Sequence, residues 1–318
     1  MFLYALGKLL RAVLVVFLVS VLTFFALELT PGSVATSILG VGATSEAVSQ
    51  LEQTLGLDRP AAVRFIEWLG NLLSGDLGNS DLTKLPIATT VMQAAFTTLQ
   101  LVVLGVLLSL GFAVVAGALA ARFPRGLIDR LGDGLTSMAI ALPTFVIGPI
   151  LAYLLAVQLG WFPVASYTPP SDGVEPWLRS IALPVFCLAL GEFATFQRLL
   201  RADLIAVLQE PYIEAARARG LSERRILMLH AMRPAAIPAM TAVGLSVGRM
   251  LGGTIIVETL FGVPGLGRTL STAILARDLD VLLVGVVLVA GAFVFINTFI
   301  DLAYGIVDPR VRLRATAS

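Results

Sequence analysis

The sequence has few of the residues on which soluble enzymes usually depend. Only 14% of its 318 side chains are charged, against about 25% in soluble globular domains, and 57% are hydrophobic. The single cysteine, Cys187, cannot form a disulfide within the chain, and the single histidine, His230, leaves no cysteine and histidine cluster for a structural zinc ion. A net charge of +1 excludes a generally basic nucleic-acid-binding protein. The composition is that of a membrane protein, and its hydrophobicity excludes intrinsic disorder.

Lysine is also scarce, and this bears on nucleotide binding. The two lysines, Lys8 and Lys84, do not lie in a G-x-x-x-x-G-K-[ST] loop, whose backbone N–H groups and lysine hold nucleotide phosphates. A hydrolase is also disfavoured, because the one histidine lies in a loop between apolar segments. We therefore expect no catalytic residue and no bound cofactor or metal ion in this chain.

Six stretches of about 20 mostly apolar residues are long enough to cross a bilayer as helices. The first differs from a cleaved signal peptide because its apolar run is long and no small-x-small cleavage site follows closely. The sequence therefore predicts an all-α membrane protein with six transmembrane helices. The predicted spans lie near residues 9–29, 97–121, 134–157, 179–200, 236–258 and 281–303.

The positions of lysine and arginine predict the orientation of these spans, because such residues are enriched in cytoplasmic segments. Fifteen of them lie on the side that holds both termini, and six lie on the other side. Both termini are therefore expected in the cytoplasm. The predicted organisation is a first helix (1–29), an extracytoplasmic segment (30–96), a membrane core (97–303) with a cytoplasmic loop (201–235), and a cytoplasmic tail (304–318).

The extracytoplasmic segment is too long for a simple connection. Residues 45–55 are expected to form a helix that Gly56 ends, and residues 58–73 a second helix that Pro60 begins. Trp68 lies beside the apolar stripe of the second helix. Two interpretations stay open, a helix at the membrane–water boundary and a small cap packed on its own core.

The cytoplasmic loop is the most patterned part of the chain. Pro211 can begin a short helix that Gly220 ends, and Ser222 can cap another helix running to Arg233. A plain solvated loop would not need two capped helices, so the pattern favours a docking role. The charged residues of this predicted surface are Glu210, Glu214, Arg217, Arg219, Glu223, Arg224 and Arg225.

Ionisable residues within the spans are costly and therefore are candidates for function. Glu192 and Arg249 lie inside the fourth and fifth spans, where they form either a structural ion pair or part of a water-filled pathway. Glu28, Glu258 and Asp301 lie near span ends, where snorkelling or capping is expected. Glu258 is nevertheless kept with Glu192 and Arg249 as a candidate for the translocation pathway.

Small residues mark two of the spans. Gly244, Gly248 and Gly252 recur at four-residue spacing, which lets another helix backbone approach closely, within the chain or in a partner. Pro143 and Pro149 interrupt the third span.

The segment Glu214-Ala215-Ala216-x3-Gly220 matches the EAA signature of permease subunits of ATP-binding-cassette importers. The surrounding sequence resembles the dipeptide/oligopeptide/nickel permease family along almost the whole chain. It is most similar to the member of each permease pair that has the long first extracellular segment. The segments that carry the resemblance are LGLDRP (55–60), WLGNLLSGDLG (68–78), LGWFPV (159–164) and VETLFGVPGLGR (257–268).

Two positions depart from the general importer pattern. Residues 230–233 read HAMR where many importer permeases have Ile-x-Leu-Pro, and the peptide subfamily commonly has a similar His-Ala-Leu-Arg. Arg249 stands where an uncharged residue is expected, which puts the substrate in question and not the family.

The resemblance implies the fold of type I importers in the bacterial cytoplasmic membrane. It further implies a homologous second permease, two cytoplasmic ATPase subunits that bind ATP and Mg, and an extracytoplasmic substrate-binding protein, with no nucleic acid. Peptides are the expected substrate, with nickel chelates, glutathione and sugars as alternatives. An ion-coupled secondary transporter is the alternative from another class.

The resemblance and the span pattern together give three sets of candidate residues. The residues that couple to the ATPases would be Glu214, Ala215, Ala216, Arg217, Gly220 and Leu221. Those of the translocation pathway would be Glu192, Arg249 and Glu258, and those of an outer gate Phe261, Pro264, Gly265 and Leu266.

Overall fold

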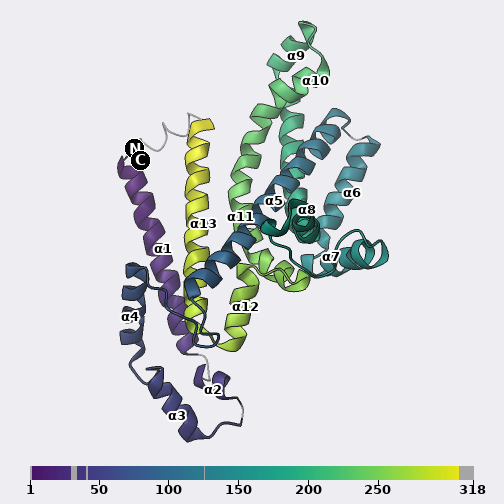
Figure 1. The fold of residues 1–318 in the computed structure, drawn as a ribbon. Coiled ribbons are helices and arrows are strands. Elements are labelled where there is room, and N and C mark those ends of the chain that lie inside the picture. Colours follow the sequence, from purple (N-terminus) through teal and green to yellow (C-terminus); the bar gives the residue numbers. More distant parts are fainter. Residues whose placement is uncertain (1, 30–33, 41, 125, 308–318) are drawn as a thin grey trace. The chain divides into compact units, whose positions relative to one another are not determined.

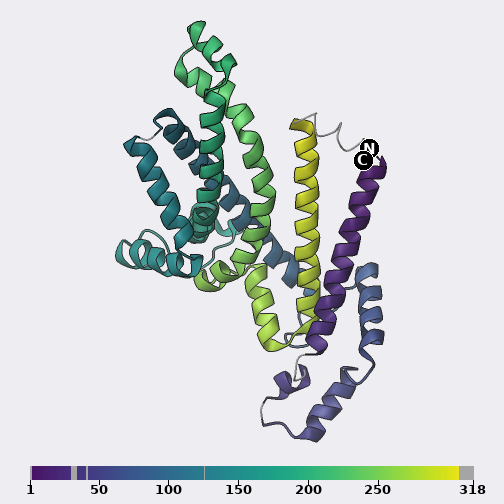
Figure 2. The ribbon, with the colours of Figure 1, turned by 180° about the vertical axis from the view of Figure 1, so that it is seen from behind.

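The computed structural model describes residues 2–29, 34–40, 42–124 and 126–307, which are mostly helical (Figures 1 and 2). Within these ranges there is no β-strand, only an isolated bridge between Asn79 and Pro86. Five helices are long and apolar enough to cross a membrane, and a bent helix pair gives a sixth span. The predicted all-α fold with six spans is confirmed.

The third span is broken, as the sequence predicted from Pro143. Helix α6 (Leu127–Ala141) and helix α7 (Thr144–Leu151), which continues into the π-helical η1 (Ala152–Gln158), meet at a bend of 107°. The break lies at Leu142 and Pro143. A residue before proline is pushed towards extended backbone, and Leu142 has φ −99° and ψ 116°. Pro143 also has no N–H to continue the helical ladder.

The contacts divide the chain into two compact units. Unit 1 comprises the described residues among 1–98 and 264–295, and unit 2 those among 99–263 and 296–307. Helix α5 (Ile87–Arg122) and helix α13 (Leu279–Val307) contribute to both.

Unit 1 contains helices α1 (Phe2–Glu28), α2 (Val34–Leu39), α3 (Ser45–Thr54), α4 (Ala61–Ser74) and α12 (Leu266–Ala276). The two predicted extracytoplasmic helices are therefore present, as α3 and α4. Helix α4 packs on α1 through the Phe65 ring, which lies 5.3 Å from Phe24 and 5.8 Å from Trp68 between ring centroids. Ile66 and Leu73 on the same helix are 67% and 80% exposed, so α4 does not bury its whole apolar stripe within the chain.

Unit 2 contains the bent pair described above together with helix α8 (Val174–Leu208), preceded by the 3-10 turn η2 (Pro170–Asp172). Helix α9 (Pro211–Ala218), helix α10 (Glu223–Arg225), the π-helical η3 (Ile226–Ala231) and helix α11 (Met232–Phe261) complete it. Its core lies between α5, α7, α8 and α11. Gly105 permits the close approach, because a Cβ there would lie 3.3 Å from Met250 and 3.4 Å from Leu188.

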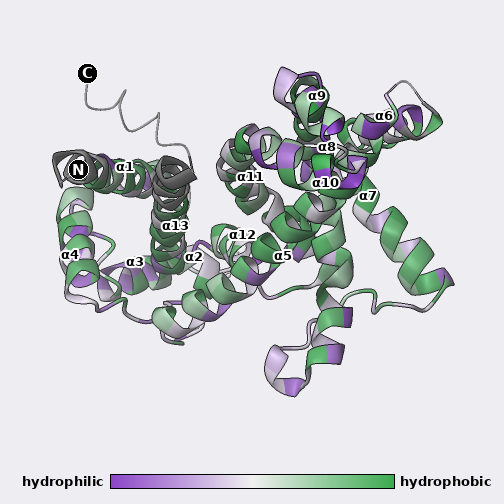
Figure 3. Ribbon diagram, turned by 90° about the horizontal axis from the view of Figure 1, so that it is seen from above, coloured by the Kyte–Doolittle hydropathy of each residue, from purple (hydrophilic) through white to green (hydrophobic). Residues whose placement is uncertain are grey.

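Helices α9 and α10 form a tip beyond the ends of α8 and α11 (Figure 1). Apolar residues cover much of the surface of the long helices, as expected for contact with lipid, and hydrophilic residues gather on this tip (Figure 3). The cytoplasmic loop predicted from the sequence is this tip.

Candidate coupling site and membrane pathway

Helix α9 has one buried face, and that face holds it to the rest of unit 2. Pro211 occupies the first turn of the helix. A backbone N–H there has no helical carbonyl to donate to, so proline, which lacks this N–H, loses no hydrogen bond. Ile213 and Ala216, three residues apart, are buried in an apolar cluster that includes Leu204 and Ile226. Burial of a side chain such as Ile213 contributes about 1.5–3 kcal/mol, so α9 is firmly seated.

The other face of α9 is exposed. It carries Glu214, Ala215 and Arg217, whereas Ala216 of the same motif points inward. The motif therefore serves two purposes: one alanine fits the helix closely to its support, and the glutamate and the other alanine face outward.

A glycine turn ends α9. Gly220 has φ +80°, in the left-handed region that glycine adopts without steric cost, and its N–H donates to the Arg217 carbonyl at 2.9 Å. The Leu221 N–H donates to the Ala216 carbonyl at 3.3 Å, and the Leu221 side chain packs on the cluster that holds α9. The predicted role of Gly220 in ending the helix agrees with this geometry.

The prediction for the second helix of the tip was wrong in two respects. Ser222 stands at the N-cap of α10 but its side chain makes no capping hydrogen bond. The helix also does not end at Arg233, because α10, η3 and α11 run on as one helix, Glu223–Phe261, of 39 residues. At 1.5 Å per residue it is about 58 Å long, nearly twice the roughly 30 Å of bilayer hydrocarbon.

A π-helical stretch, η3, lies just before Pro234 in this long helix. Pro234 has no N–H to donate to the His230 carbonyl four residues earlier. That carbonyl instead accepts a hydrogen bond from the Tyr212 hydroxyl of α9, at 3.4 Å. The helix therefore continues past Pro234, and the hydrogen bond from Tyr212 connects it to α9.

Three charged residues connect the tip to the end of α5. Arg217 Nε donates to Glu223 Oε1 at 2.8 Å, and Arg122 Nη1 lies 3.7 Å from Glu223 Oε2. The hydrogen bond to Glu223 raises the pKa of Arg217, which keeps its charge at every physiological pH. All three side chains are about 40% exposed, so the network orients the tip more than it stabilises the fold.

A second arginine–glutamate pair lies in the middle of the spans. Arg249 on α11 meets Glu192 on α8, with Nε 3.0 Å from Oε1 and Nη2 2.6 Å from Oε2. Ser246, one turn before Arg249, donates its hydroxyl to Glu192 Oε2 at 2.5 Å, and Arg249 Nη2 also lies 2.8 Å from that hydroxyl. The structural ion pair considered from the sequence is present.

The two partners of this pair differ in exposure. The Glu192 side chain is 9% exposed and that of Arg249 is 51% exposed. About half of the Arg249 side-chain surface is therefore exposed at mid-span. A charge facing lipid there would be costly, so the arrangement favours a water-filled pathway or a partner subunit beside Arg249.

Two family models together match nearly the whole chain. The model described as the N-terminal part of the membrane component of binding-protein-dependent transport systems matches residues 1–108. The model of the "Binding-protein-dependent transport system inner membrane component" matches residues 113–313. The chain belongs to this family.

Curated relatives show which kind of permease within the family the chain resembles. It is 37% identical to a probable peptide ABC transporter permease of Sinorhizobium fredii over 97% of this chain and 99% of the relative. It is 36% identical to a putative peptide transport system permease of Brucella abortus, covering 95% and 96% of the two chains. A glutathione transport system permease of Escherichia coli is 33% identical, covering 98% and 99%. The resemblance to the dipeptide and oligopeptide type of importer permease is confirmed.

The fold of the permease has a solved counterpart. The crystal structure of an amino acid ABC transporter with histidines matches 68% of this chain and 94% of that chain, with a TM-score of 0.51 and 18% identity. This likeness supports the importer permease fold. The chain is a multi-pass membrane permease of an ABC importer.

Glu258 of the permease lies in different surroundings from those expected near a span end. Its side chain is fully buried, with none of its surface exposed, so the expectation that it snorkels to the membrane boundary was wrong. The structure does not bring Glu258 together with the Glu192–Arg249 pair through any hydrogen bond that it describes. Its assignment to the pathway remains a prediction.

The glycine stripe of α11 is packed at one end only. Gly244 is buried, but Gly252 is exposed, and a Cβ there would meet nothing within 4 Å. A tight interface within the permease therefore does not extend along the whole stripe. At Gly252 the alternative in which a partner covers the stripe stays open.

The predicted outer gate follows α11. Gly262 ends that helix with φ +67°, and the next helix, α12, begins at Leu266. The four gate candidates differ in exposure. Pro264 is exposed, whereas Phe261, Gly265 and Leu266 are buried. Leu266 also donates its N–H to Thr98 Oγ1 at 2.7 Å. Its side chain packs in the core of unit 1, so Pro264 is the better position for contact with another protein.

Sequence reasoning missed one ion pair of unit 2. Arg201 on α8 donates to Asp129 on α6 through two hydrogen bonds, of 2.5 and 2.7 Å, and Asp129 is 3% exposed. Arg201 had been counted only among the arginines that predict the orientation, and Asp129 had not been considered. The two residues are 72 positions apart, and no sequence pattern connects them, so the pair is visible only in the folded structure.

Proposed function

We propose that the permease imports peptides. It forms the membrane pathway together with a homologous second permease and receives substrate from an extracytoplasmic binding protein. Two cytoplasmic ATPase subunits bind ATP and Mg and supply the energy, and both termini of the permease lie in the cytoplasm. The support comes from relatives named as peptide and glutathione permeases, since glutathione is itself a tripeptide.

The observation that carries the coupling mechanism is the two-faced helix α9. Its buried Ile213 and Ala216 fix it to unit 2, while Glu214, Ala215 and Arg217 face outward at the tip. Docked in a cleft of an ATPase subunit, such a helix moves as a rigid body when ATP closes the ATPase dimer. ATP binds the two conformations with different affinity, and this difference drives alternating access.

Arg249 is proposed to face the pathway. Its guanidinium is bound by Glu192, and the Arg249 side chain as a whole is half exposed. A permanently charged guanidinium favours a carboxylate, and a peptide has one at its C-terminus. Glu192 then serves as the counter-ion that keeps Arg249 in place before substrate arrives.

Purification of the tagged permease from its own host, followed by reconstitution, tests this function. Two nucleotide-binding subunits and a second permease are expected to co-purify. Uptake of labelled peptides into proteoliposomes should require ATP and the binding protein. Uptake driven by an ion gradient without ATPase subunits would instead establish a secondary transporter.

A further inference from the structure

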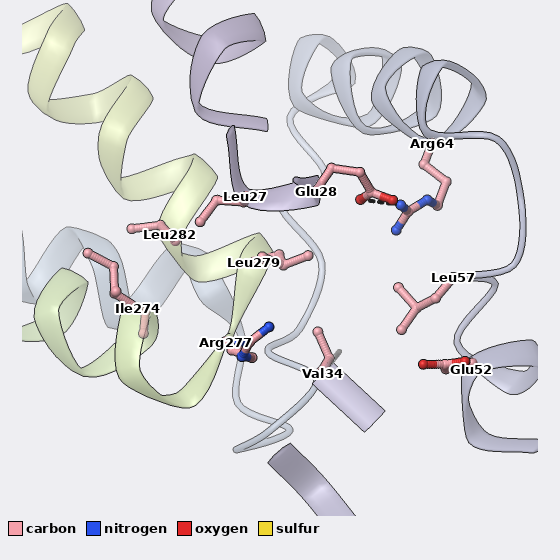
Figure 4. Close-up of a pocket in the computed structure, with 11 residues that line it drawn as sticks. Leu27, Glu28, Val34, Glu52, Leu57, Arg64, Ile274, Arg277, Leu279 and Leu282 are labelled. Carbon is pink, nitrogen blue, oxygen red and sulfur yellow. Dashed lines mark ion pairs between the residues drawn. The ribbon is translucent and has the colours of Figure 1, made fainter. Parts of the chain in front are cut away.

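Unit 1 encloses a cavity of about 330 Å³ that the transport mechanism above does not use (Figure 4). Four charged side chains from four parts of the chain line it, Glu28 at the end of α1, Glu52 on α3, Arg64 on α4 and Arg277 after α12. Two positive and two negative charges make the lining neutral overall. Such a lining suits a ligand that itself carries one charge of each sign.

The arginines are held in place by the fold. Arg64 forms an ion pair with Glu28, and its side chain is only 11% exposed. Arg64 Nε is buried beside the cavity with no hydrogen-bond partner among the described residues. A buried guanidinium N–H without an acceptor is unfavourable, so this part of the cavity is suited to an anionic oxygen.

Arg277 is held in an unfavourable backbone conformation. It has φ +60°, a left-handed conformation that few residues other than glycine and asparagine adopt. Residues kept in such strained conformations concentrate at ligand sites. An arginine at a turn where glycine would be less strained is consistent with a use for its guanidinium.

The cavity lies at the level of the membrane boundary. Glu28 is the last residue of the first candidate span and Leu279 is the first described residue of the last one. Leu27 and Leu282 add an apolar surface from the ends of the same two helices. Charged groups beside apolar span ends are what the head and upper chain of a lipid meet, whichever side of the membrane this is.

We propose that this cavity binds the headgroup of a zwitterionic phospholipid with a primary ammonium, such as phosphatidylethanolamine. The phosphate accepts hydrogen bonds from Arg64 and Arg277, because guanidinium groups match phosphate geometry. The ammonium donates to Glu52, and the acyl chains lie along Leu27 and Leu282. A choline headgroup has no N–H to donate to Glu52, so it binds less well.

Lipid retention by the assembled transporter tests this site. The complex is incubated in detergent with phosphatidylethanolamine, phosphatidylcholine or phosphatidylglycerol, and the bound lipid is counted by native mass spectrometry. The complex should retain phosphatidylethanolamine about tenfold better than phosphatidylcholine, the factor expected for one charge-assisted hydrogen bond. Equal retention of the three lipids would overturn the proposal.

Two substitutions separate the two ends of the headgroup. Arg277→Asn removes the guanidinium but keeps a residue that tolerates the left-handed backbone, and it should lower retention of all three phospholipids. Glu52→Gln keeps the shape and should abolish only the preference for ethanolamine over choline. Should Arg277→Asn not assemble, Glu52→Gln alone decides, because α3 has no buried residue.

The matched control is Arg59→Gln. Arg59 belongs to the same region, but it forms an exposed pair with Glu67 outside the cavity lining, with side chains 48% and 49% exposed. It should leave lipid retention unchanged. Variants at Glu52 and Arg277 that retain lipid normally but respond less to the binding protein would make the cavity a protein-docking site and refute lipid binding.

Discussion

Two arginine–glutamate pairs of the permease have similar geometry and opposite surroundings. In the middle of the spans, Arg249 meets a Glu192 carboxylate that is 9% exposed. At the tip, Arg217 meets a Glu223 carboxylate that is 42% exposed. The first carboxylate depends on its partner for solvation, whereas water can replace the partner of the second. Breaking the first pair should therefore lower stability, and breaking the second should mainly disturb the position of α9.

The largest effect on stability is expected from Arg249→Ala. It leaves the Glu192 charge buried with only Ser246 as a donor, at a cost of roughly 2–4 kcal/mol. The thermal unfolding midpoint of the complex in nanodiscs should fall, and the double variant with Glu192→Ala should recover part of the loss. Glu192→Ala alone should cost less, because the exposed half of Arg249 can be solvated. Equal losses for the two single variants would contradict this asymmetry.

Arg249→Lys keeps the positive charge and extends the same comparison to transport. It should fold nearly normally but lose the two-pronged geometry of the guanidinium. Uptake of peptides with a free C-terminal carboxylate should then slow more than uptake of C-terminally amidated peptides. Equal slowing of both peptide types in a well-folded complex would remove Arg249 from the substrate pathway.

At the tip, Gly220→Pro and Glu214→Lys should uncouple ATP hydrolysis from transport. Proline cannot adopt φ +80°, and lysine reverses a charge on the outward face of α9. We expect uptake to fall by more than about tenfold, the factor that 1.4 kcal/mol of lost coupling represents, while the permease still assembles. The controls are Gly220→Asn, which tolerates the left-handed backbone, and Glu214→Gln. Wild-type uptake and normal ATPase stimulation in the first two variants would argue against coupling through α9.

The smallest effects should come from the exposed pair itself. Arg217→Glu should leave the unfolding midpoint unchanged but reduce uptake modestly, and the exchange Arg217→Glu with Glu223→Arg should restore it. Because exposed charges are screened, the defect of the single variant should shrink as salt is raised. A defect that is insensitive to salt, or that the exchange does not repair, would show that Arg217 contacts the ATPase and not Glu223.

Cysteine labelling tests the predicted orientation of the permease in the membrane. The native Cys187 is buried, and burial raises a thiol's resistance to labelling, so the background should be low. An impermeant maleimide added to intact cells should modify Pro264→Cys but not Ala215→Cys, although both positions are exposed. Leu266→Cys, at a position only 3% exposed, should react more slowly than Pro264→Cys. Labelling of Ala215→Cys from outside would reverse the orientation.

The apolar runs and the EAA signature were sufficient to predict the spans and the tip, because both depend on local sequence. The partner of Arg249 was left open because pairing depends on how α8 and α11 rotate against each other. The continuation of the tip into α11 could not be foreseen, since Pro234 normally indicates a helix boundary. Here the Tyr212 hydroxyl satisfies the carbonyl that the proline leaves open. The cavity of unit 1 draws on residues that are hundreds of positions apart and has no signal in the sequence.

The continuous helix Glu223–Phe261 connects the tip mechanically to the site around Arg249. Arg249 lies 26 residues from Glu223 on this one helix of 39 residues, a distance of about 39 Å. A tilt of about 5° would therefore displace one position by roughly 3 Å relative to the other. Coupling between two binding sites is reciprocal. If ATP binding to the ATPases changes the affinity of the site around Arg249 for a ligand, a ligand bound there changes the affinity for ATP by the same free energy. In the proposed mechanism, the permease signals bound substrate to the ATPases through the same helix by which the ATPases move the substrate.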